Sequence, residues 1–167
     1  KALEGRVTGK TVLDLGGYDG RQAQWCLNNG AKHAICVDNR EYIFYDNWKD
    51  KELYPDVKYI WQDMFLYNHM ADVVIYQNVI YHQKNPWLCL EKVRSLTKEV
   101  MVMATSIVSG EEEIWRVYKP YEGHPISWTV SWRPTVNGLL TLLSNVGFKS
   151  EVIKTDGGSI VVRCTLC

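Results

Sequence analysis

A glycine-rich turn and a neighbouring aspartate are the residues of this sequence best suited to bind a ligand. The apolar run Thr11–Leu15 leads directly into Gly16-Gly17-Tyr18-Asp19-Gly20, and a second apolar run, Ala34–Val37, ends at Asp38. Glycines let a backbone turn sharply and approach a ligand closely, because they have no Cβ. A carboxylate at the tip of the second strand can accept hydrogen bonds from both hydroxyls of a ribose. The pattern therefore predicts a site for a nucleoside-containing cofactor.

The spacing of the glycines distinguishes two classes of cofactor. Tyr18 stands where Gly-x-Gly-x-x-Gly has its middle glycine, which disfavours a dinucleotide held by its pyrophosphate, as in nicotinamide-dependent enzymes. Asp14, Gly16 and Gly20 form instead an Asp-x-Gly-x-x-x-Gly pattern, the form used for S-adenosylmethionine. We expect the amino-acid part of that cofactor to lie against the turn. The alternative for Asp38 is a carboxylate that caps the following helix.

Polar residues also follow the later apolar runs Val57–Trp61 and Asp72–Tyr76. Asp63 can accept a hydrogen bond from an adenine amine, or it can simply cap a loop. Trp61, Gln62 and Met64 can flank the adenine, although core packing explains Trp61 and Met64 equally well. The expected cofactor-binding residues are Asp14, Gly16, Gly17, Tyr18, Gly20, Asp38, Asn39, Asp63, Met64, Gln77 and Asn78.

Tyr81 and His82 are the expected catalytic residues. They follow the run Asp72–Tyr76, whose carboxyl end faces the ligand crevice of an open α/β sheet. His82 has the ordinary pKa of a general base near neutral pH, which an oxygen acceptor would require. The aromatic faces of Tyr18 or Tyr81 can stabilise a sulfonium by cation–π contact. A purely structural role for His82 is equally compatible with the sequence.

Strand and helix patterns alternate along the chain and predict a Rossmann-like α/β fold. We expect a mostly parallel seven-stranded sheet, helices on both faces and an antiparallel C-terminal hairpin at Asp156-Gly157-Gly158. The predicted strands are Thr11–Leu15, Ala34–Val37, Val57–Trp61, Asp72–Tyr76, Val100–Ala104, Phe148–Lys154 and Ser159–Cys164, and the predicted helices are Arg21–Asn29, Glu41–Lys51, Pro86–Leu96 and Pro134–Asn145. The chain is expected to form one domain over residues 1–167, with an irregular segment at 106–133 that is either a substrate-facing lid or a cover for the sheet. In that segment a polar or anionic acceptor can meet Arg116, Lys119, His124, Trp128 or Arg133.

Composition narrows the partners and the compartment. Lys plus Arg and Asp plus Glu number 19 each, so overall charge gives no support for a nucleic-acid partner. No apolar run reaches the roughly 18 residues of a membrane span. Five cysteines, three of them in apolar patterns, indicate free thiols in a reducing compartment, and we expect a cytoplasmic protein. Cys164 and Cys167 have CxxC spacing but no second pair, so no metal site is expected.

Two segments resemble class I S-adenosylmethionine-dependent methyltransferases, and more narrowly the tRNA wobble-uridine carboxymethyltransferase family. Gly9 to Asp38 follows the family's order of strand, glycine turn, helix, Gly-Ala, strand and Asp without a gap. Val79-Ile-Tyr-His-Gln-Lys-Asn-Pro86 is similar to its Val-Leu-Tyr-His-Arg-x-x-Pro signature. Trp132 to Thr135 and Asn145 to Phe148 match further landmarks more loosely. The resemblance implies methyl transfer from S-adenosylmethionine to an RNA or a small molecule.

The sequence also departs from that family. Family members hold an extra carboxylate on the cofactor with a Tyr, a Lys and an Arg. The Tyr matches Tyr81, but the Lys belongs to an N-terminal extension that this sequence does not include, and Gly157-Gly158 replaces the Arg. We therefore expect ordinary S-adenosylmethionine rather than its carboxylated form. The alternative is a catalytically silent methyltransferase-like scaffold.

Overall fold

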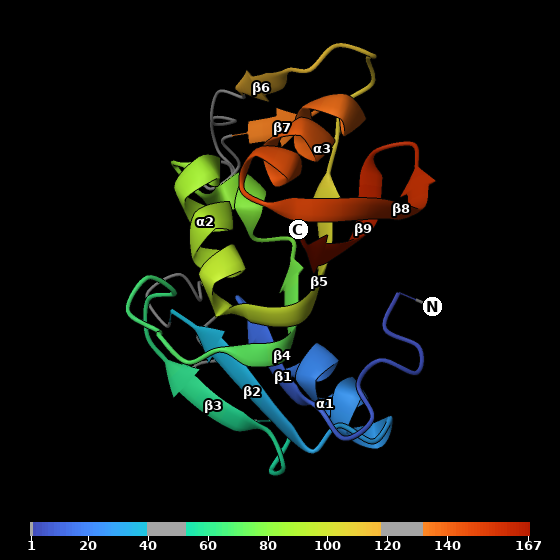
Figure 1. Cartoon of the computed structure of the whole chain (residues 1–167). Coiled ribbons are helices and arrows are strands. Elements are labelled where there is room, and N and C mark those ends of the chain that lie inside the picture. Colours follow the sequence, from blue (N-terminus) through green and yellow to red (C-terminus); the bar gives the residue numbers. More distant parts are fainter. Residues whose placement is uncertain (1, 40–52, 118–131) are drawn as a thin grey trace.

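The computed structural model describes residues 2–39, 53–117 and 132–167. Its largest element is a seven-stranded sheet of order β3-β2-β1-β4-β5-β9-β8, in which the first five strands are parallel and β9 and β8 run antiparallel (Figure 1). The elements are β1 (Thr11–Leu15), α1 (Arg21–Asn28), β2 (His33–Asp38), β3 (Lys58–Trp61), β4 (Ala71–Gln77), the 3-10 turn η3 (Ile80–His82), α2 (Pro86–Leu96), β5 (Thr97–Ser106), β6 (Trp115–Val117), β7 (Trp132–Pro134), α3 (Val136–Asn145), β8 (Phe148–Asp156) and β9 (Ser159–Leu166). This architecture confirms the predicted fold class.

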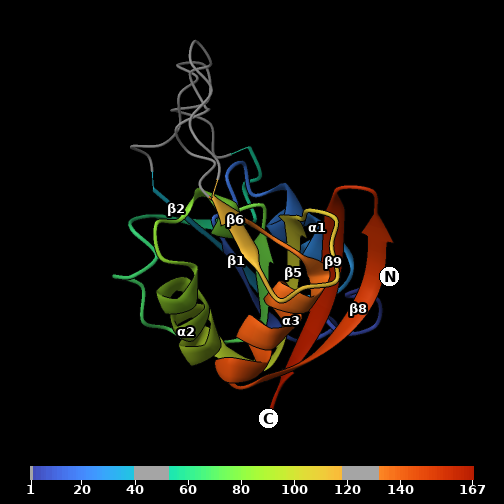
Figure 2. The ribbon, with the colours of Figure 1, turned by 90° about the horizontal axis from the view of Figure 1, so that it is seen from above.

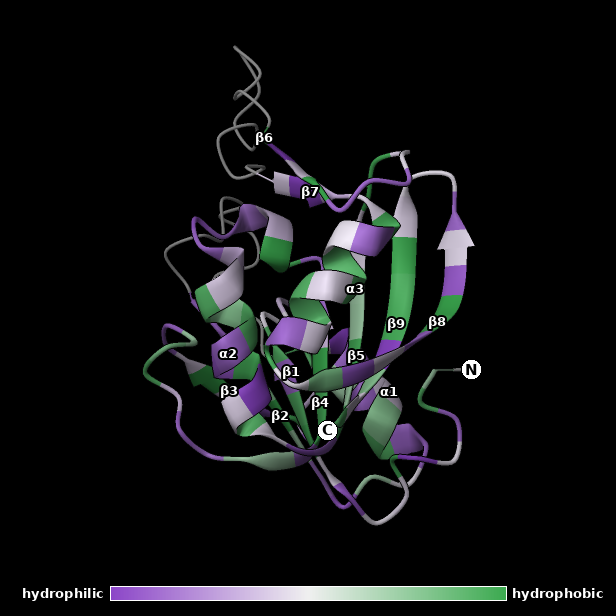
Figure 3. Cartoon of the chain, turned by 45° about the horizontal axis from the view of Figure 1, so that its top comes forward, coloured by the Kyte–Doolittle hydropathy of each residue, from purple (hydrophilic) through white to green (hydrophobic). Residues whose placement is uncertain are grey.

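Helices cover both faces of the sheet (Figure 2). On one face α2 and α3 pack with β1, β4 and β5 in a core that includes Leu90, Leu139 and Met101. On the other face Ala23 and Cys26 of α1 pack with the opposite side chains of the same strands. The central strands are buried on both sides, and Figure 3 shows their apolar character in green between helices with more hydrophilic outer surfaces.

Helix boundaries follow from short capping signals. Pro86 occupies the first turn of α2, and the side chain of Asn85 accepts a hydrogen bond from the Leu88 N–H at 3.1 Å. Gly30, which follows α1, has a φ of 89° and supplies the left-handed residue that commonly ends a helix. These features confirm the predicted bounds of α2 and place the end of α1 within one residue of the prediction.

The sequence predictions differ from the structure at the start of α3 and in the segment 106–133, and one predicted helix lies outside the described residues. Helix α3 begins at Val136 rather than Pro134, because Pro134 belongs to β7 and Thr135 caps the helix through its hydroxyl. The segment 106–133, which is predicted to be irregular, contains β6 and the start of β7. The predicted helix Glu41–Lys51 lies outside the described residues.

Candidate active site at the carboxyl ends of the strands

The glycine turn and Asp38 meet at the carboxyl ends of β1 and β2. These strands pair in parallel from Thr11–His33 to Leu15–Val37, so the turn after β1 emerges beside the tip of β2. The backbone N–H of Tyr18 donates a hydrogen bond to Asp38 Oδ2 at 2.7 Å, and the N–H of Asn39 donates to Oδ1 at 2.7 Å. Asp38 therefore lies beside the glycine turn, and both of its carboxylate oxygens accept hydrogen bonds from backbone donors.

Each glycine of the turn is required by close packing. A Cβ at Gly16 would lie 2.3 Å from the Val79 side chain, and one at Gly20 would lie 2.5 Å from the Tyr59 hydroxyl. A Cβ at Gly17 would lie 2.5 Å from the carboxyl carbon of Asp14. The turn is thus packed against Asp14 of its own strand, against Tyr59 of β3 and against the loop after β4, and a side chain at these positions would require its neighbours or the turn to move.

Asp14 lies beneath the glycine turn, next to Gly17. The carboxyl group is buried, and its Oδ2 accepts a hydrogen bond from the Ala23 N–H of α1 at 3.2 Å. Burial raises the pKa of Asp14 to about 7, and the nearby carboxylates of Asp38 and Asp19 add to the increase. Burial also raises the pKa of Asp38, while the two backbone N–H donors oppose the increase. Several acidic groups therefore share this end of the sheet.

Backbone strain is concentrated at the same rim. Among residues 2–39, 53–117 and 132–167, the non-glycine residues with positive φ are Tyr18, at 53°, and Asn78, at 58°. Tyr18 belongs to the turn after β1 and Asn78 to the loop after β4, and β1 and β4 are adjacent in the sheet. Each such conformation costs on the order of 1 kcal/mol or more, and such residues cluster at binding sites. The strain therefore marks these two loops as functional candidates.

Tyr81 and His82 lie just beyond β4 in η3. Their rings are in contact, with centroids 4.2 Å apart, and both side chains are partly buried. Gln77 ends β4, and the Asn78 N–H donates to the Ala104 carbonyl of β5 at 2.8 Å. The structure therefore brings the predicted catalytic pair to the same rim as the glycine turn, and β4 is the strand next to β1.

The residues after β3 are less well placed to contact a cofactor. Asp63 is exposed, and its Oδ1 accepts a hydrogen bond from the Phe65 N–H at 2.8 Å, so it caps the turn that follows. Met64 packs against the main core, and Trp61 stacks on Tyr59 with centroids 5.7 Å apart. The Gln62 N–H still donates to the Asp38 carbonyl at 2.9 Å, which keeps this loop beside Asp38. These contacts explain the residues without a ligand.

Tyr59 and Val79 are neighbours of the site that sequence reasoning missed. The Tyr59 hydroxyl donates to the Asp19 carbonyl at 2.9 Å and closes the side of the turn near Gly20. Val79 lies against Gly16 from the loop after β4. Their positions, one within a strand and the other just after a strand end, were visible in the sequence, but their contacts depend on the packing of distant segments.

Of the five residues expected to meet the acceptor, the structure describes two. Arg116 lies on β6 and Arg133 on β7, whereas Lys119, His124 and Trp128 lie outside the described residues. All five cysteines are free thiols, and four of them are buried. Within the described ranges, no group of three or more His, Cys, Asp or Glu side chains is arranged to hold a metal. None of the helices in the described part of the chain is long and apolar enough to cross a bilayer.

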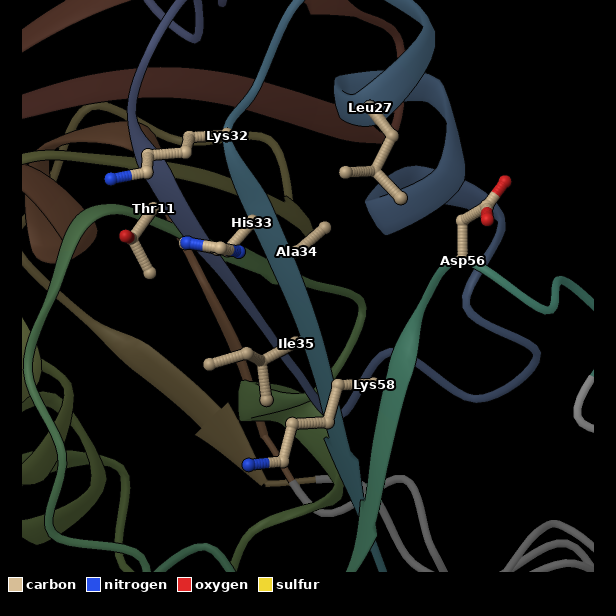
Figure 4. Close-up of a pocket in the computed structure, with 8 residues that line it drawn as sticks. All are labelled: Thr11, Leu27, Lys32, His33, Ala34, Ile35, Asp56 and Lys58. Carbon is tan, nitrogen blue, oxygen red and sulfur yellow. The ribbon is translucent and has the colours of Figure 1, made fainter.

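A separate hollow of about 300 Å³ lies at the amino ends of β1, β2 and β3 (Figure 4). Lys32, His33 and Lys58 are among its lining residues. Since β2 runs from His33 at this end to Asp38 at the other, the hollow is at the opposite end of the strands from the glycine turn. Ligands of open α/β sheets bind at the carboxyl ends, so this hollow is not the predicted nucleoside site.

Comparisons with known proteins agree with the geometry. No family model matches the chain. The chain is 26% identical to a tRNA U34 carboxymethyltransferase of Idiomarina loihiensis over 155 residues, which cover 86% of this chain and 46% of that protein. It is 25% identical to the tRNA U34 carboxymethyltransferase of Dichelobacter nodosus over 153 residues, 87% of this chain and 48% of that protein. The chain spans about half the length of these curated relatives.

Solved structures share the fold at lower identity. The N-terminal domain of EvdMO1, crystallised with S-adenosylhomocysteine and D-fucose, has a TM-score of 0.70 at 17% identity and covers 99% of this chain and 78% of that chain. The 1,6-didemethyltoxoflavin-N1-methyltransferase of Burkholderia thailandensis has a TM-score of 0.70 at 16% identity, covering 95% and 72%. The chain is therefore similar in sequence to tRNA U34 carboxymethyltransferases and has the fold of S-adenosylmethionine-dependent methyltransferases.

Proposed function

We propose that this chain is an S-adenosylmethionine-dependent methyltransferase. The observation that carries the proposal is the 2.7 Å hydrogen bond from the Tyr18 N–H to Asp38, which joins the glycine turn to the acid of the adjacent strand. A nucleoside at this rim would have its ribose hydroxyls at Asp38 and its amino-acid part at the turn. Sequence relatives and the fold neighbours bound to S-adenosylhomocysteine support the same assignment.

The charges at the rim favour a cationic cofactor over a pyrophosphate. Asp38 lies beside the turn, whereas Asp14 has a pKa of about 7 and Asp19 is paired with Arg21. S-adenosylmethionine has a positive sulfonium and a positive ammonium, which the carboxylate of Asp38 attracts, whereas the pyrophosphate of NAD is repelled. The residues present therefore fit S-adenosylmethionine. When bound, this cofactor supplies an activated methyl group on sulfur.

The residues of the chain contribute orientation and proton transfer. In-line displacement at a methyl group depends mainly on alignment of donor and acceptor, which rigid loops at the strand ends provide. The ring of Tyr81 offers an aromatic face to a cation, and the imidazole of His82 is the candidate base for an acceptor hydroxyl. The backbone N–H of His82 donates to the Val79 carbonyl at 3.0 Å, which fixes this turn in place.

The acceptor is an RNA or a small molecule, and the protein is cytoplasmic in this proposal. The four buried free thiols support a reducing compartment. The proposal also treats residues 1–167 as one domain with an insertion at 106–133, supported by β6 and β7, which pair with each other outside the main sheet. A catalytically silent scaffold is the alternative.

Calorimetry and a methyl-transfer screen test the proposal. We expect S-adenosylmethionine and S-adenosylhomocysteine to bind the purified chain at one site, with no heat from NAD. Pools of RNA and metabolites are then incubated with methyl-labelled cofactor. Labelled product confirms the enzyme, bound cofactor without any product favours the scaffold, and failure of both adenosyl compounds to bind contradicts the proposal.

A further inference from the structure

The ribbon formed by β6 and β7 places two arginines side by side. The strands pair antiparallel with Arg116 directly opposite Arg133. Side chains directly opposite each other in an antiparallel pair project to the same face, with Cβ atoms about 5 Å apart, and like charges in this position are destabilising. A bound anion would convert this repulsion into two attractions.

The other face of the ribbon is fixed to the body of the protein. Trp115 and Pro134, which alternate with the two arginines, pair with each other, and the Trp115 indole donates to the Gly138 carbonyl of α3 at 3.1 Å. A Cβ at Gly138 would lie 2.5 Å from the Ile114 carbonyl, so the ribbon is in backbone contact with the helix. The ribbon is therefore anchored through its apolar face, and the arginine pair belongs to the opposite face.

Arg133 is the member of the pair that lies nearer to the predicted catalytic turn. β7 packs against η3, and the ribbon lies beyond the carboxyl ends of β4 and β5 (Figure 1). Burial raises the pKa of Tyr81, while the positive charge of Arg133 opposes that increase, which places the guanidinium within electrostatic reach of the phenol. Arg133 is partly buried and Arg116 is exposed, so the pair leads from Tyr81 outward to solvent.

The charge of this surface suits one small anion better than a polyanion. Two guanidinium groups can hold a carboxylate or phosphate through paired N–H donors. A nucleic acid needs an extended basic surface, but the chain has no net charge, and the exposed Glu111, Glu112 and Glu113 precede β6. Among the described residues Arg116 has no ion pair, so its guanidinium is accessible to a ligand.

We propose that Arg116 and Arg133 form the acceptor subsite and bind a small methyl acceptor through its carboxylate or phosphate group, beside Tyr81 and His82. The inference rests on the proposed function, because it assigns the substrate class of the same site.

Fluorine NMR of protein labelled with 5-fluorotryptophan tests the subsite. Trp115 and Trp132 are next to the two arginines in sequence, and their signals are assigned by single substitution. Benzoate and inorganic phosphate are titrated into protein saturated with S-adenosylhomocysteine. We expect these two signals to shift, and we expect Arg116→Gln and Arg133→Gln each to weaken anion binding about tenfold or more, with Arg133→Lys intermediate.

Arg163→Gln is the matched control, because Arg163 also lies opposite a charged residue in an antiparallel pair, Glu151, but in the main sheet. It should leave anion binding unchanged. Equal anion affinity in wild type and Arg133→Gln would overturn the subsite while leaving cofactor binding intact. Absence of S-adenosylhomocysteine binding in the wild type would overturn the proposed function itself.

Two further titrations separate other sources of the anion. Binding of single-stranded RNA with a steep salt dependence that either arginine variant removes would assign the pair to nucleic acid and contradict a small acceptor. Preferential, Arg133-dependent binding of carboxylated S-adenosylmethionine over the ordinary cofactor would place the carboxylate on the cofactor and likewise overturn the acceptor assignment.

Discussion

Replacing Asp38 with alanine should remove most of the affinity for S-adenosylhomocysteine. If Asp38 accepts both ribose hydroxyls, the substitution deletes two charge-assisted hydrogen bonds, each of about 1.5–3 kcal/mol. The sum of about 3–6 kcal/mol corresponds to a dissociation constant raised roughly 10²- to 10⁴-fold. Asp38→Asn keeps the shape and one acceptor oxygen, so its loss should be intermediate.

The stability of the ligand-free protein should change far less than the affinity. Asp38 accepts the N–H groups of Tyr18 and Asn39, and the alanine variant leaves both donors without this acceptor. Burial of the charge already opposes folding, as the raised pKa of Asp38 indicates, so its removal compensates part of the lost hydrogen bonding. We expect a decrease of about 1 kcal/mol in the free energy of unfolding, measured in urea.

Asp72→Ala provides the matched control. Its carboxylate accepts the Thr11 N–H at 2.9 Å and pairs with Lys98 at 3.6 Å, at the amino end of β4 and away from the glycine turn. This variant should lose comparable stability and retain wild-type affinity in calorimetry. An Asp38→Ala protein that folds and binds S-adenosylhomocysteine within twofold of wild type would refute the assignment of the ribose to this acid.

Three more substitutions probe the glycine turn, the buried acid beneath it and the cap of α3. Gly17→Ala should weaken cofactor binding at least about tenfold in calorimetry, because the new Cβ would overlap the Asp14 carboxyl group, whereas Gly158→Ala, with open space around it, should change nothing. The pKa of Asp14 is raised from 3.8 to about 7, so between these values the folded state binds a proton that the unfolded state has lost, and the free energy of unfolding should fall as the pH rises from about 4 to about 7. Asp14→Asn should flatten this pH dependence in urea titrations. An unchanged slope would contradict a buried, protonated Asp14. Thr135→Ala removes the hydroxyl that caps α3 by accepting the Gly138 N–H, and it should cost about 1–2 kcal/mol in the same assay; a loss within error of zero would show that the cap contributes little.

The sheet could be predicted from sequence because its strands are apolar and separated by strong turn signals. Thr11–Leu15 became β1 with the predicted bounds, and Asp156 to Gly158 formed the predicted hairpin. The β6–β7 ribbon was missed because each strand has three residues, too few for a period to be detected. The predicted helix start at Pro134 is wrong, because Pro134 pairs with Trp115 in the ribbon and the Thr135 cap starts the helix later.

Some features of the site could likewise be predicted from sequence patterns, whereas others depend on tertiary packing. The proximity of the glycine turn and Asp38 follows from topology, since parallel strands one crossover apart bring their carboxyl ends together. Asp63 was ambiguous because a carboxylate after a strand serves a cap or a ligand equally well, and here it caps a turn. The contact between Gly16 and Val79 depends on side-chain packing between separate loops, which a single sequence does not encode in any local pattern.

The energetically unfavourable groups lie at one edge of the sheet and the apolar core lies below them, and this separation bears on function. Tyr18 and Asn78 have strained backbones and Asp14 is a buried acid, and all three lie at or beneath the rim formed by the carboxyl ends of β1, β2 and β4. The strands below the rim are almost completely buried and apolar, and they hold these unfavourable groups in place. A sequence selected for stability alone would relax such groups, since glycine at position 18 or 78 would remove the strain without loss of core contacts. Their joint placement on one edge is therefore better explained by a ligand that binds there than by the requirements of folding.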